Sequence, residues 1–220
     1  MNKLFIIPNS DLRNIKVQDN HEPLVDLRKE CPALVFKIPY YVEKNGGAKA
    51  VEDAHFARKS IAQKLNSAQS ALPTSLKLSI DGAYRSPKMQ QKSYDAVLKN
   101  LRKEKTDWSE EKLKEEMTKR VSEVDIAPHC TGGAIDLTIV DSNNKPLDMG
   151  TKIDEYSELT YTNADLISNK AKQNRTLLID IMTKAGFINF PAEWWHWSYG
   201  DREWAYFQPN KTAIYAAIER

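Results

Sequence analysis

The sequence predicts an α+β fold, with a central, mostly antiparallel sheet flanked by helices. Hydrophobic residues recur at helical spacing in the first half of the chain, whereas short alternating segments typical of strands dominate the second half. The 220 residues contain no internal repeat and no Gly/Ser-rich linker, and this length suits one ordinary domain. We therefore expect residues 1–220 to form a single α+β domain.

Residues 1–47 are expected to form an irregular N-terminal segment. Four prolines interrupt it, and it ends in an Asn-Gly-Gly stretch at 45–47 that favours a turn. Two short apolar stretches, at 34–36 and 40–42, are candidates for edge strands. Proline is tolerated in a sheet only at its edge, so neither stretch is expected in the middle of one.

The next part of the chain predicts a helix, a strand and a second helix. Apolar residues recur every three or four positions over 54–72, which is the spacing of one helix face. Residues 76–80 then alternate between apolar and polar, as in a half-buried strand. Ser86 and Pro87 follow as an N-cap and a first-turn proline, so a helix is expected to begin there.

A second strand is predicted over 134–140, where apolar side chains alternate with Asp136 and Thr138. Alternate side chains of a strand point to opposite faces, so one face should be apolar and the other polar. A polar turn at 141–145 suggests a hairpin that returns through 147–149.

The last third predicts one helix and two strands. Apolar spacing over 170–185 indicates a helix that ends at Gly186, because glycine favours the left-handed position after a helix. The segments 187–190 and 194–199 are expected to be the last strands. Helices first and a mostly antiparallel sheet afterwards give the α+β class.

Composition and charge exclude several classes of function. Lys and Arg number 32 against 30 Asp and Glu, and a net charge of +2 gives no electrostatic case for a nucleic-acid partner. The early apolar run from Leu4 to Ile7 is far shorter than the roughly 20 residues of a membrane span or the ~7–15 residues of a signal-peptide core. Two cysteines are too few for a disulfide scaffold. We therefore expect a cytoplasmic protein without a membrane partner.

Two of the four histidines have neighbours that suggest chemistry. His129 precedes Asp136 in a turn that leads into a strand, and His196 follows Glu193 in the stretch Glu-Trp-Trp-His. Two imidazoles and one carboxylate can form a zinc site that leaves a fourth position for water. A further carboxylate close to that water is the general base that a metal-assisted hydrolase needs.

The spacing within each pair limits how the site can form. His129 and Asp136 are seven residues apart, and Glu193 and His196 are three apart. On a regular strand an odd separation places two side chains on opposite faces. Each pair can converge only where the backbone is irregular, and a glycine pair before Asp136 and a proline before Glu193 supply that irregularity. Spacing therefore permits a metal site without establishing it.

Other interpretations of the same residues remain open. A histidine beside tryptophans is more often a buried structural side chain than a ligand. Cys130 adjoins His129 and could be a nucleophile, although no third group for a Cys/His pair is visible. Four of the five tryptophans lie within 194–204 and could form a stacking surface, but core packing around a metal site is the simpler interpretation.

Four motifs follow one another in the 76–199 part of the chain. Residues 129–136 fit the pattern H-x-x-G-x-A-x-D, and residues 193–196 fit E-x-W-H. The stretch Tyr-Arg-Ser-Pro at 84–87 precedes a predicted helix, and Met-Gly-Thr-Lys-Ile-Asp stands at 149–154. Together, and in this order, these motifs resemble those of the zinc D-Ala-D-Ala dipeptidases of the VanX type. That family belongs to the wider group of D-Ala-D-Ala carboxypeptidases and L,D- or D,D-peptidases.

The resemblance implies a role for each matching residue. It implies one zinc ion per chain, held by three ligands: His129, Asp136 and His196. Glu193 would be the general base, and Arg85 would stabilise the tetrahedral intermediate, where a fixed guanidinium favours the developing oxyanion. Asp154 would pair with the free ammonium of the substrate and so restrict cleavage to very short peptides.

The activity implied by the resemblance is zinc-dependent hydrolysis of D-Ala-D-Ala to D-alanine, with a small D,D-dipeptide as the partner. The alternative within the same group is a peptidoglycan D,D- or L,D-carboxypeptidase that trims stem peptides. A zinc-containing binding module is a third interpretation, which Glu193 and Arg85 disfavour because a structural zinc needs neither. The chain departs from the family pattern at Ala127, where the family has a Ser that helps to hold the substrate amine. The N-terminal third also lacks the Asn-Phe-x-Gly stretch expected of the family.

Overall fold

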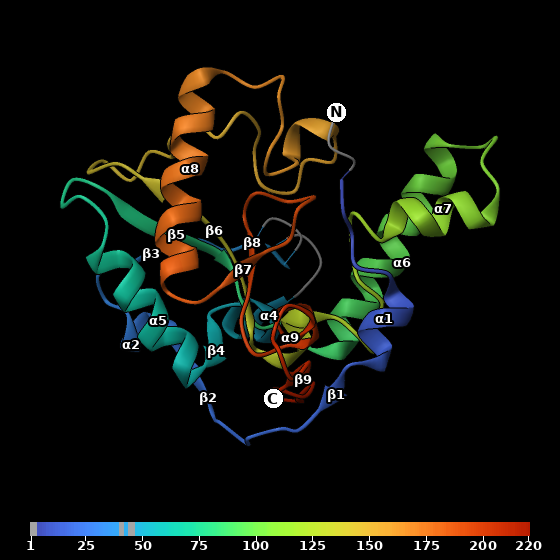
Figure 1. Ribbon diagram of the computed structural model, residues 1–220, viewed down its shortest axis with the longest axis horizontal. Helices are drawn as coiled ribbons and strands as arrows, with labels where there is room; N and C mark the ends of the chain where they lie inside the picture. The colour runs from blue at the N-terminus through green and yellow to red at the C-terminus, as the bar shows by residue number, and fades with distance from the viewer. Residues whose placement is uncertain (1–3, 40–41, 44–46) are drawn as a thin grey trace.

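A computed structural model describes residues 4–39, 42–43 and 47–220 and confirms the α+β prediction (Figure 1). Its centre is a five-stranded sheet with the strand order β3-β5-β6-β8-β7. β3 is parallel to β5, and the other neighbouring pairs are antiparallel. The strands are β3 (Val35–Phe36), β5 (Lys77–Gly82), β6 (Ala134–Val140), β7 (Ile188–Asn189) and β8 (His196–Ser198).

β6 is the central strand and is buried along its whole length. Ile135, Leu137 and Ile139 belong to the main hydrophobic core. Asp136 and Thr138 alternate with them and therefore face the other side of the sheet. The predicted alternation is confirmed, and one strand carries both a core face and a polar face.

Two helices, α5 (Lys59–Ser70) and α8 (Asn169–Lys184), cover the core face of the sheet. They contact each other and lie on the same side of the sheet (Figure 1). α8 begins at Ser168, whose hydroxyl accepts a hydrogen bond from the amide of Ala171. Gly186 follows the helix with a φ of 91°, a conformation that favours glycine. The predicted helix over 170–185 is thus confirmed.

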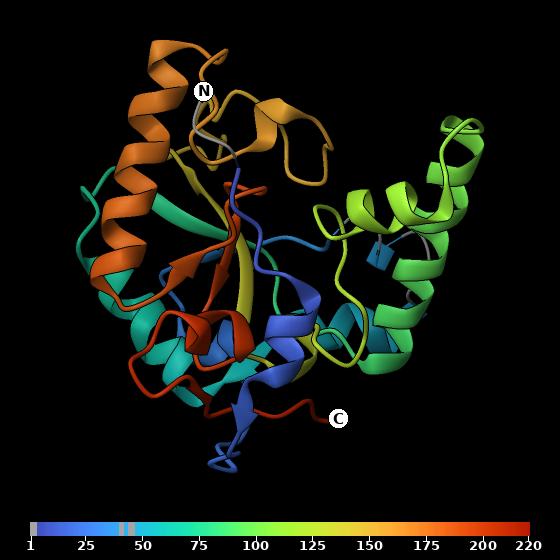
Figure 2. The same ribbon diagram turned by 45° about the vertical axis from the view of Figure 1, so that its right-hand side comes forward.

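The helices α6 (Pro87–Glu104) and α7 (Glu110–Met117) project beside the sheet (Figure 2). Ser86 caps α6 by accepting a hydrogen bond from the amide of Met89, as the sequence predicts. The two helices share a small core of their own, formed by Leu101, Leu113 and Met117. We call residues 87–122 the helical arm.

The N-terminal segment has more structure than expected. Its elements are α1 (Asn9–Asn14), β1 (Lys16–Val17), β2 (Leu24–Asp26), α2 (Leu27–Glu30) and α4 (Gly47–Asp53). β1 pairs with β9 (Thr212–Ala213), which follows the short helix α9 (Arg202–Tyr206), and β2 pairs with β4 (Phe56–Arg58). These partners come from later in the chain, so local spacing could not reveal them. No helix among the described residues is both long and apolar enough to cross a membrane.

The two candidate edge strands have different outcomes. The stretch at 34–36 is confirmed, because β3 lies at the edge of the central sheet. Residues 40 and 41 of the second stretch lie outside the described residues.

The helix expected over 54–72 begins later, at Lys59. Two carbonyls accept hydrogen bonds from the segment that follows β5 instead of from a helix: the amide of Ala83 donates to Ala54, and the amide of Tyr84 donates to Phe56. Pairing of β4 with β2 engages the same stretch. Tertiary hydrogen bonds therefore override the helical spacing of the first few residues.

The hairpin expected after β6 is only partly formed. The turn is present, since the amide of Asp141 donates to the carbonyl of Lys145 and Leu147 donates to Ile139. The return segment forms one isolated bridge, between Val140 and Pro146, rather than a strand. Proline has no amide hydrogen, which weakens a ladder at that point.

Candidate metal centre and active site

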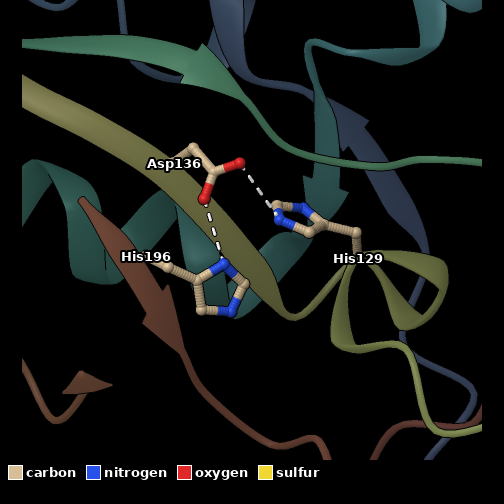
Figure 3. Close-up of side chains that lie close together, drawn as sticks. All are labelled: His129, Asp136 and His196. Atoms are coloured by element: carbon tan, nitrogen blue, oxygen red, sulfur yellow. Dashed lines mark hydrogen bonds and ion pairs between the residues drawn. The ribbon is translucent and has the colours of Figure 1, made fainter. Parts of the chain in front are cut away.

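Three elements bring the predicted ligands together on the polar face of the sheet (Figure 3). Asp136 of β6 lies directly opposite His196 of β8 in the antiparallel register. His129 approaches from the 3₁₀ turn Pro128–Thr131. Gly132 then takes a φ of 72° to lead the chain into β6, and a Cβ there would lie 2.4 Å from Leu24.

The three side chains lie close enough together to hold a metal ion. Nε2 of His129 lies 3.1 Å from one carboxylate oxygen of Asp136, and Nδ1 of His196 lies 3.0 Å from the other. The possible ligand atoms all lie within 4.8 Å of one another. Each residue is 5–6% exposed, so the cluster is nearly dry.

The protonation pattern tests whether this cluster suits a cation. Nδ1 of His129 lies 2.6 Å from the carbonyl of Ala83, and this carbonyl can only accept, so Nδ1 carries a hydrogen. In the neutral imidazole Nε2 is then an acceptor, and it faces another acceptor, the carboxylate of Asp136. A bound cation resolves this contact. Burial acts to raise the pKa of Asp136, but the two histidines outweigh it and hold that pKa below its usual range.

Glu193 lies in the turn before β8. Its amide donates to the carbonyl of Phe190, and its carbonyl accepts from the amide of His196. These bonds form the irregular backbone that lets residues three apart face one cavity. Burial raises the pKa of Glu193 well above its ordinary value, nearby Asp136 and Asp154 raise it further, and Arg85 opposes the rise.

Arg85 connects the sheet to the helical arm. Its backbone amide donates to the carbonyl of His129 at 3.2 Å, and its guanidinium donates to Gln90 of α6 at 3.0 Å. The first bond joins the Tyr-Arg-Ser-Pro stretch to the turn that carries His129. Arg85 therefore lines the same cavity as His129, Asp136 and His196.

Asp154 reaches this cavity from the long connection between β6 and α8. Its φ of 64° is uncommon for a residue with a side chain. Two contacts anchor the connection: Arg175 donates to the carbonyl of Met149, and Trp194 donates to Thr151, both at 2.8 Å. Burial raises the pKa of Asp154 to about 6, and the charge of Asp136 adds to the rise.

These residues line one cavity of about 570 Å³ between the sheet and the helical arm. All six predicted site residues face it. The arm lines the rest of the cavity, with polar side chains such as Ser93, Asn100 and Ser122.

Three residues near the site carry no sequence signal of their own. Tyr156 and the buried Glu203 line the cavity. Asp81 lies on β5, where burial raises its pKa to about 7 and the charges of Asp136 and Asp154 add to the rise. The pairing of β5 with β6 has a β-bulge at Asp81, so that Gly82 rather than Asp81 is the partner of Asp136. Only the folded chain brings these residues to the site.

The alternative interpretations of the sequence find little support. Cys130 is fully buried, and burial raises the pKa of its thiol to about 12, so it is not a ready nucleophile. Trp194, Trp195 and Trp197 are at most 2% exposed and belong to the main core. Their role is packing rather than surface stacking.

Comparisons with known proteins find partial matches to several peptidases. A chain from Synechocystis sp. described as D-alanyl-D-alanine dipeptidase is 39% identical over 109 residues, which are 42% of this chain and 44% of that protein. A second, from Escherichia coli, is 43% identical over 68 residues, 31% of this chain and 35% of its own. The matches thus span less than half the length of these curated relatives. A solved structure of the D,D-pentapeptidase VanY with zinc covers 66% of this chain and 72% of its own, at 16% identity and a TM-score of 0.43.

The family comparison covers most of the chain. A family model described as D-Ala-D-Ala dipeptidase matches residues 20–214. This range includes every predicted site residue, the whole central sheet and the helical arm. The chain belongs to the D-Ala-D-Ala dipeptidase family.

Proposed function

We propose that this chain is a zinc-dependent dipeptidase that hydrolyses D-Ala-D-Ala to D-alanine, with one zinc ion per chain. One observation carries the proposal: a His-Asp-His cluster shares a single cavity with two further carboxylates and an arginine. Membership of the family supports the same activity. The ligands would be His129, Asp136 and His196.

Glu193 would be the general base. When bound, zinc would polarise a water molecule and lower its pKa toward neutrality. Glu193 would take the proton from that water and later deliver it to the leaving amine. Burial raises the pKa of Glu193, and this makes its carboxylate a stronger base than an exposed glutamate.

Arg85 and Asp154 would hold the two ends of the reacting peptide. The planar guanidinium of Arg85 is fixed by Gln90 and can favour the oxyanion that develops at the scissile carbonyl. The carboxylate of Asp154 would pair with the substrate ammonium, which would otherwise lose its hydration without a counter-charge. Together they would align a free dipeptide across the proposed metal site.

A second candidate is a carboxypeptidase that trims longer peptidoglycan stem peptides. The size of the cavity favours it, since about 570 Å³ lies within the ~300–1,000 Å³ that holds drug-sized ligands. Two alanines fill only part of that space. The part along the helical arm is free of the proposed catalytic residues and could hold the rest of a longer peptide.

Release of D-alanine from D-Ala-D-Ala and from a stem peptide, with and without a chelator, tests both candidates. The dipeptidase predicts fast, chelator-sensitive turnover of the free dipeptide and little of the stem peptide. The opposite preference would replace it with the carboxypeptidase. Full turnover after verified removal of the metal would contradict both.

A further inference from the structure

A buried polar cluster lies behind His196, on the side away from Asp136. Nε2 of His196 lies 3.4 Å from the hydroxyl of Ser198 and 3.8 Å from a carboxylate oxygen of Glu203. The same hydroxyl lies 3.5 Å from that oxygen. Ser198 is fully buried and Glu203 is 4% exposed, so both groups are held away from bulk water.

The contacts of His196 settle which nitrogen faces which group. Nδ1 faces Asp136 and is the atom available to a metal ion. A neutral imidazole with Nδ1 free must carry its hydrogen on Nε2. That hydrogen points toward the two oxygen atoms of Ser198 and Glu203.

Besides His196, the charges that act on Glu203 are those of the buried Asp201 and Asp136, which have the same sign. Among the described residues, its polar side-chain contacts are with Ser198 and His196. It comes from the first turn of α9, which Asp201 caps by accepting a hydrogen bond from the amide of Trp204. The cap fixes the start of the helix and with it the position of the carboxylate. A buried carboxylate is unfavourable unless a donor or a charge compensates it.

We propose that Glu203 is a positioning residue of the proposed metal centre. The hydroxyl of Ser198 accepts the Nε2 hydrogen of His196 and donates its own hydrogen to Glu203, whose carboxylate also faces Nε2, and this arrangement reserves Nδ1 for the metal. The inference rests on the proposed zinc site and adds a residue that the motifs do not contain. A carboxylate behind a ligating histidine fixes the ring and makes the ligand more basic, and losing such a group typically weakens metal binding by about 10- to 100-fold.

The positioning role of Glu203 can be tested by measuring zinc affinity, which does not depend on peptidase activity. The dissociation constant is measured by chelator competition for the wild type, Glu203→Gln, Ser198→Ala and the double variant. Glu203→Gln keeps the size of the side chain and removes its charge. Glu22→Gln is the matched control, because Glu22 also accepts bonds from a serine and a tyrosine, Ser60 and Tyr215, but lies outside the cavity.

The expected result is a zinc dissociation constant raised by about 10-fold or more in Glu203→Gln and unchanged in Glu22→Gln. If Ser198 transmits the effect, the double variant should lose less affinity than the sum of the two single losses. The visible spectrum of the cobalt form should also change in Glu203→Gln, which a mere loss of stability would not cause.

Two different outcomes would contradict the positioning role of Glu203 and the proposed zinc site. Wild-type affinity and an unaltered cobalt spectrum in folded Glu203→Gln would overturn the positioning role and leave the zinc site intact. A wild-type chain that binds no zinc would overturn the proposed metal centre itself. Thermal melting of the metal-free variants shows that each is folded before its affinity is compared.

Discussion

The two walls of the cavity differ in how their side chains are held. The sheet wall, formed by the sheet together with α9, supplies Asp136, His196 and Glu203, which are 4–6% exposed. The opposite wall, the helical arm, supplies Ser93 and Asn100, which are partly or largely exposed on a pair of helices with its own small core. The proposed catalytic groups therefore lie on the more buried wall, whereas the more exposed arm lines the part of the cavity away from them.

The largest effect is expected at the metal on the sheet wall. His196→Ala removes one of three proposed ligands, so zinc content should fall well below one equivalent and dipeptide turnover should fall to background. Metal analysis beside the kinetic assay checks this. A full equivalent of zinc in the variant would remove His196 from the ligand set.

Glu193→Gln should separate catalysis from metal binding on the same wall. The amide keeps the shape of the side chain, so zinc should remain, but it cannot take a proton from water. General base catalysis typically contributes about 10²–10⁴-fold, and kcat should fall by that factor. Near-normal kcat in the zinc-loaded variant would assign the base to another group.

Arg85→Lys tests the residue that joins the two walls. Lysine keeps the charge but not the planar fork of donors. Losing one oxyanion donor typically costs about 2.7–4 kcal/mol in the transition state, so kcat should fall more than KM rises. Arg102→Lys, on the exposed face of α6, is the control. A variant defective in KM alone would make Arg85 a binder of the substrate carboxylate.

Asp154→Asn should reduce the preference for a free amine. In the wild type, N-acetyl-D-Ala-D-Ala should be poorer than the free dipeptide by roughly 10²-fold in kcat/KM, because acetylation removes the charge that Asp154 pairs with. Glu155→Gln, the exposed neighbour, should keep the preference. Equal wild-type values for the two substrates would sink the dipeptidase proposal and favour the carboxypeptidase.

The same residue predicts a dependence on pH. Burial raises the pKa of Asp154 to about 6, so its carboxylate is charged above that pH and protonated below it. KM for the free dipeptide should therefore rise as the pH falls through about 6, and Asp154→Asn should not show this rise. A wild-type KM that stays flat from pH 5 to 7 would contradict the pairing.

The smallest effect is expected on the helical arm. Ser93→Phe narrows the cavity away from the metal, so kcat/KM for the dipeptide should stay within about 2-fold, as for most surface substitutions. Turnover of a stem peptide, if present, should fall far more. A large loss of dipeptide turnover would show that the helical arm also contributes to the dipeptide site, contrary to the proposal.

Much of the fold could be predicted because its signals are local. The alternation in β6, the Ser-Pro start of α6 and the glycine after α8 depend only on neighbouring residues. The start of α5 could not be predicted, because the carbonyls of Ala54 and Phe56 accept hydrogen bonds from Ala83 and Tyr84, which follow β5 much later in the chain.

The site divides in the same way. The proposed ligands and Glu193 lie in short motifs that resemble a known family, and the structure brings these residues to one cavity. Glu203 and Asp81 have no motif. Glu203 reaches His196 only because α9 packs behind β8, and Asp81 approaches Asp136 through a bulge between β5 and β6. Such contacts belong to the tertiary structure.

Because side chains along β6 alternate between the core and the cavity, the register of this strand determines both the packing of the core and the position of Asp136. A one-residue deletion between the glycine pair and Asp136 would turn Leu137 toward the cavity and the aspartate into the core. Such a shift in register should abolish folding and metal binding together, so no variant of this kind should lose one and keep the other. Point substitutions in this strand can have small or large effects. Insertions and deletions should be tolerated only after the strand, in the turn at 141–145.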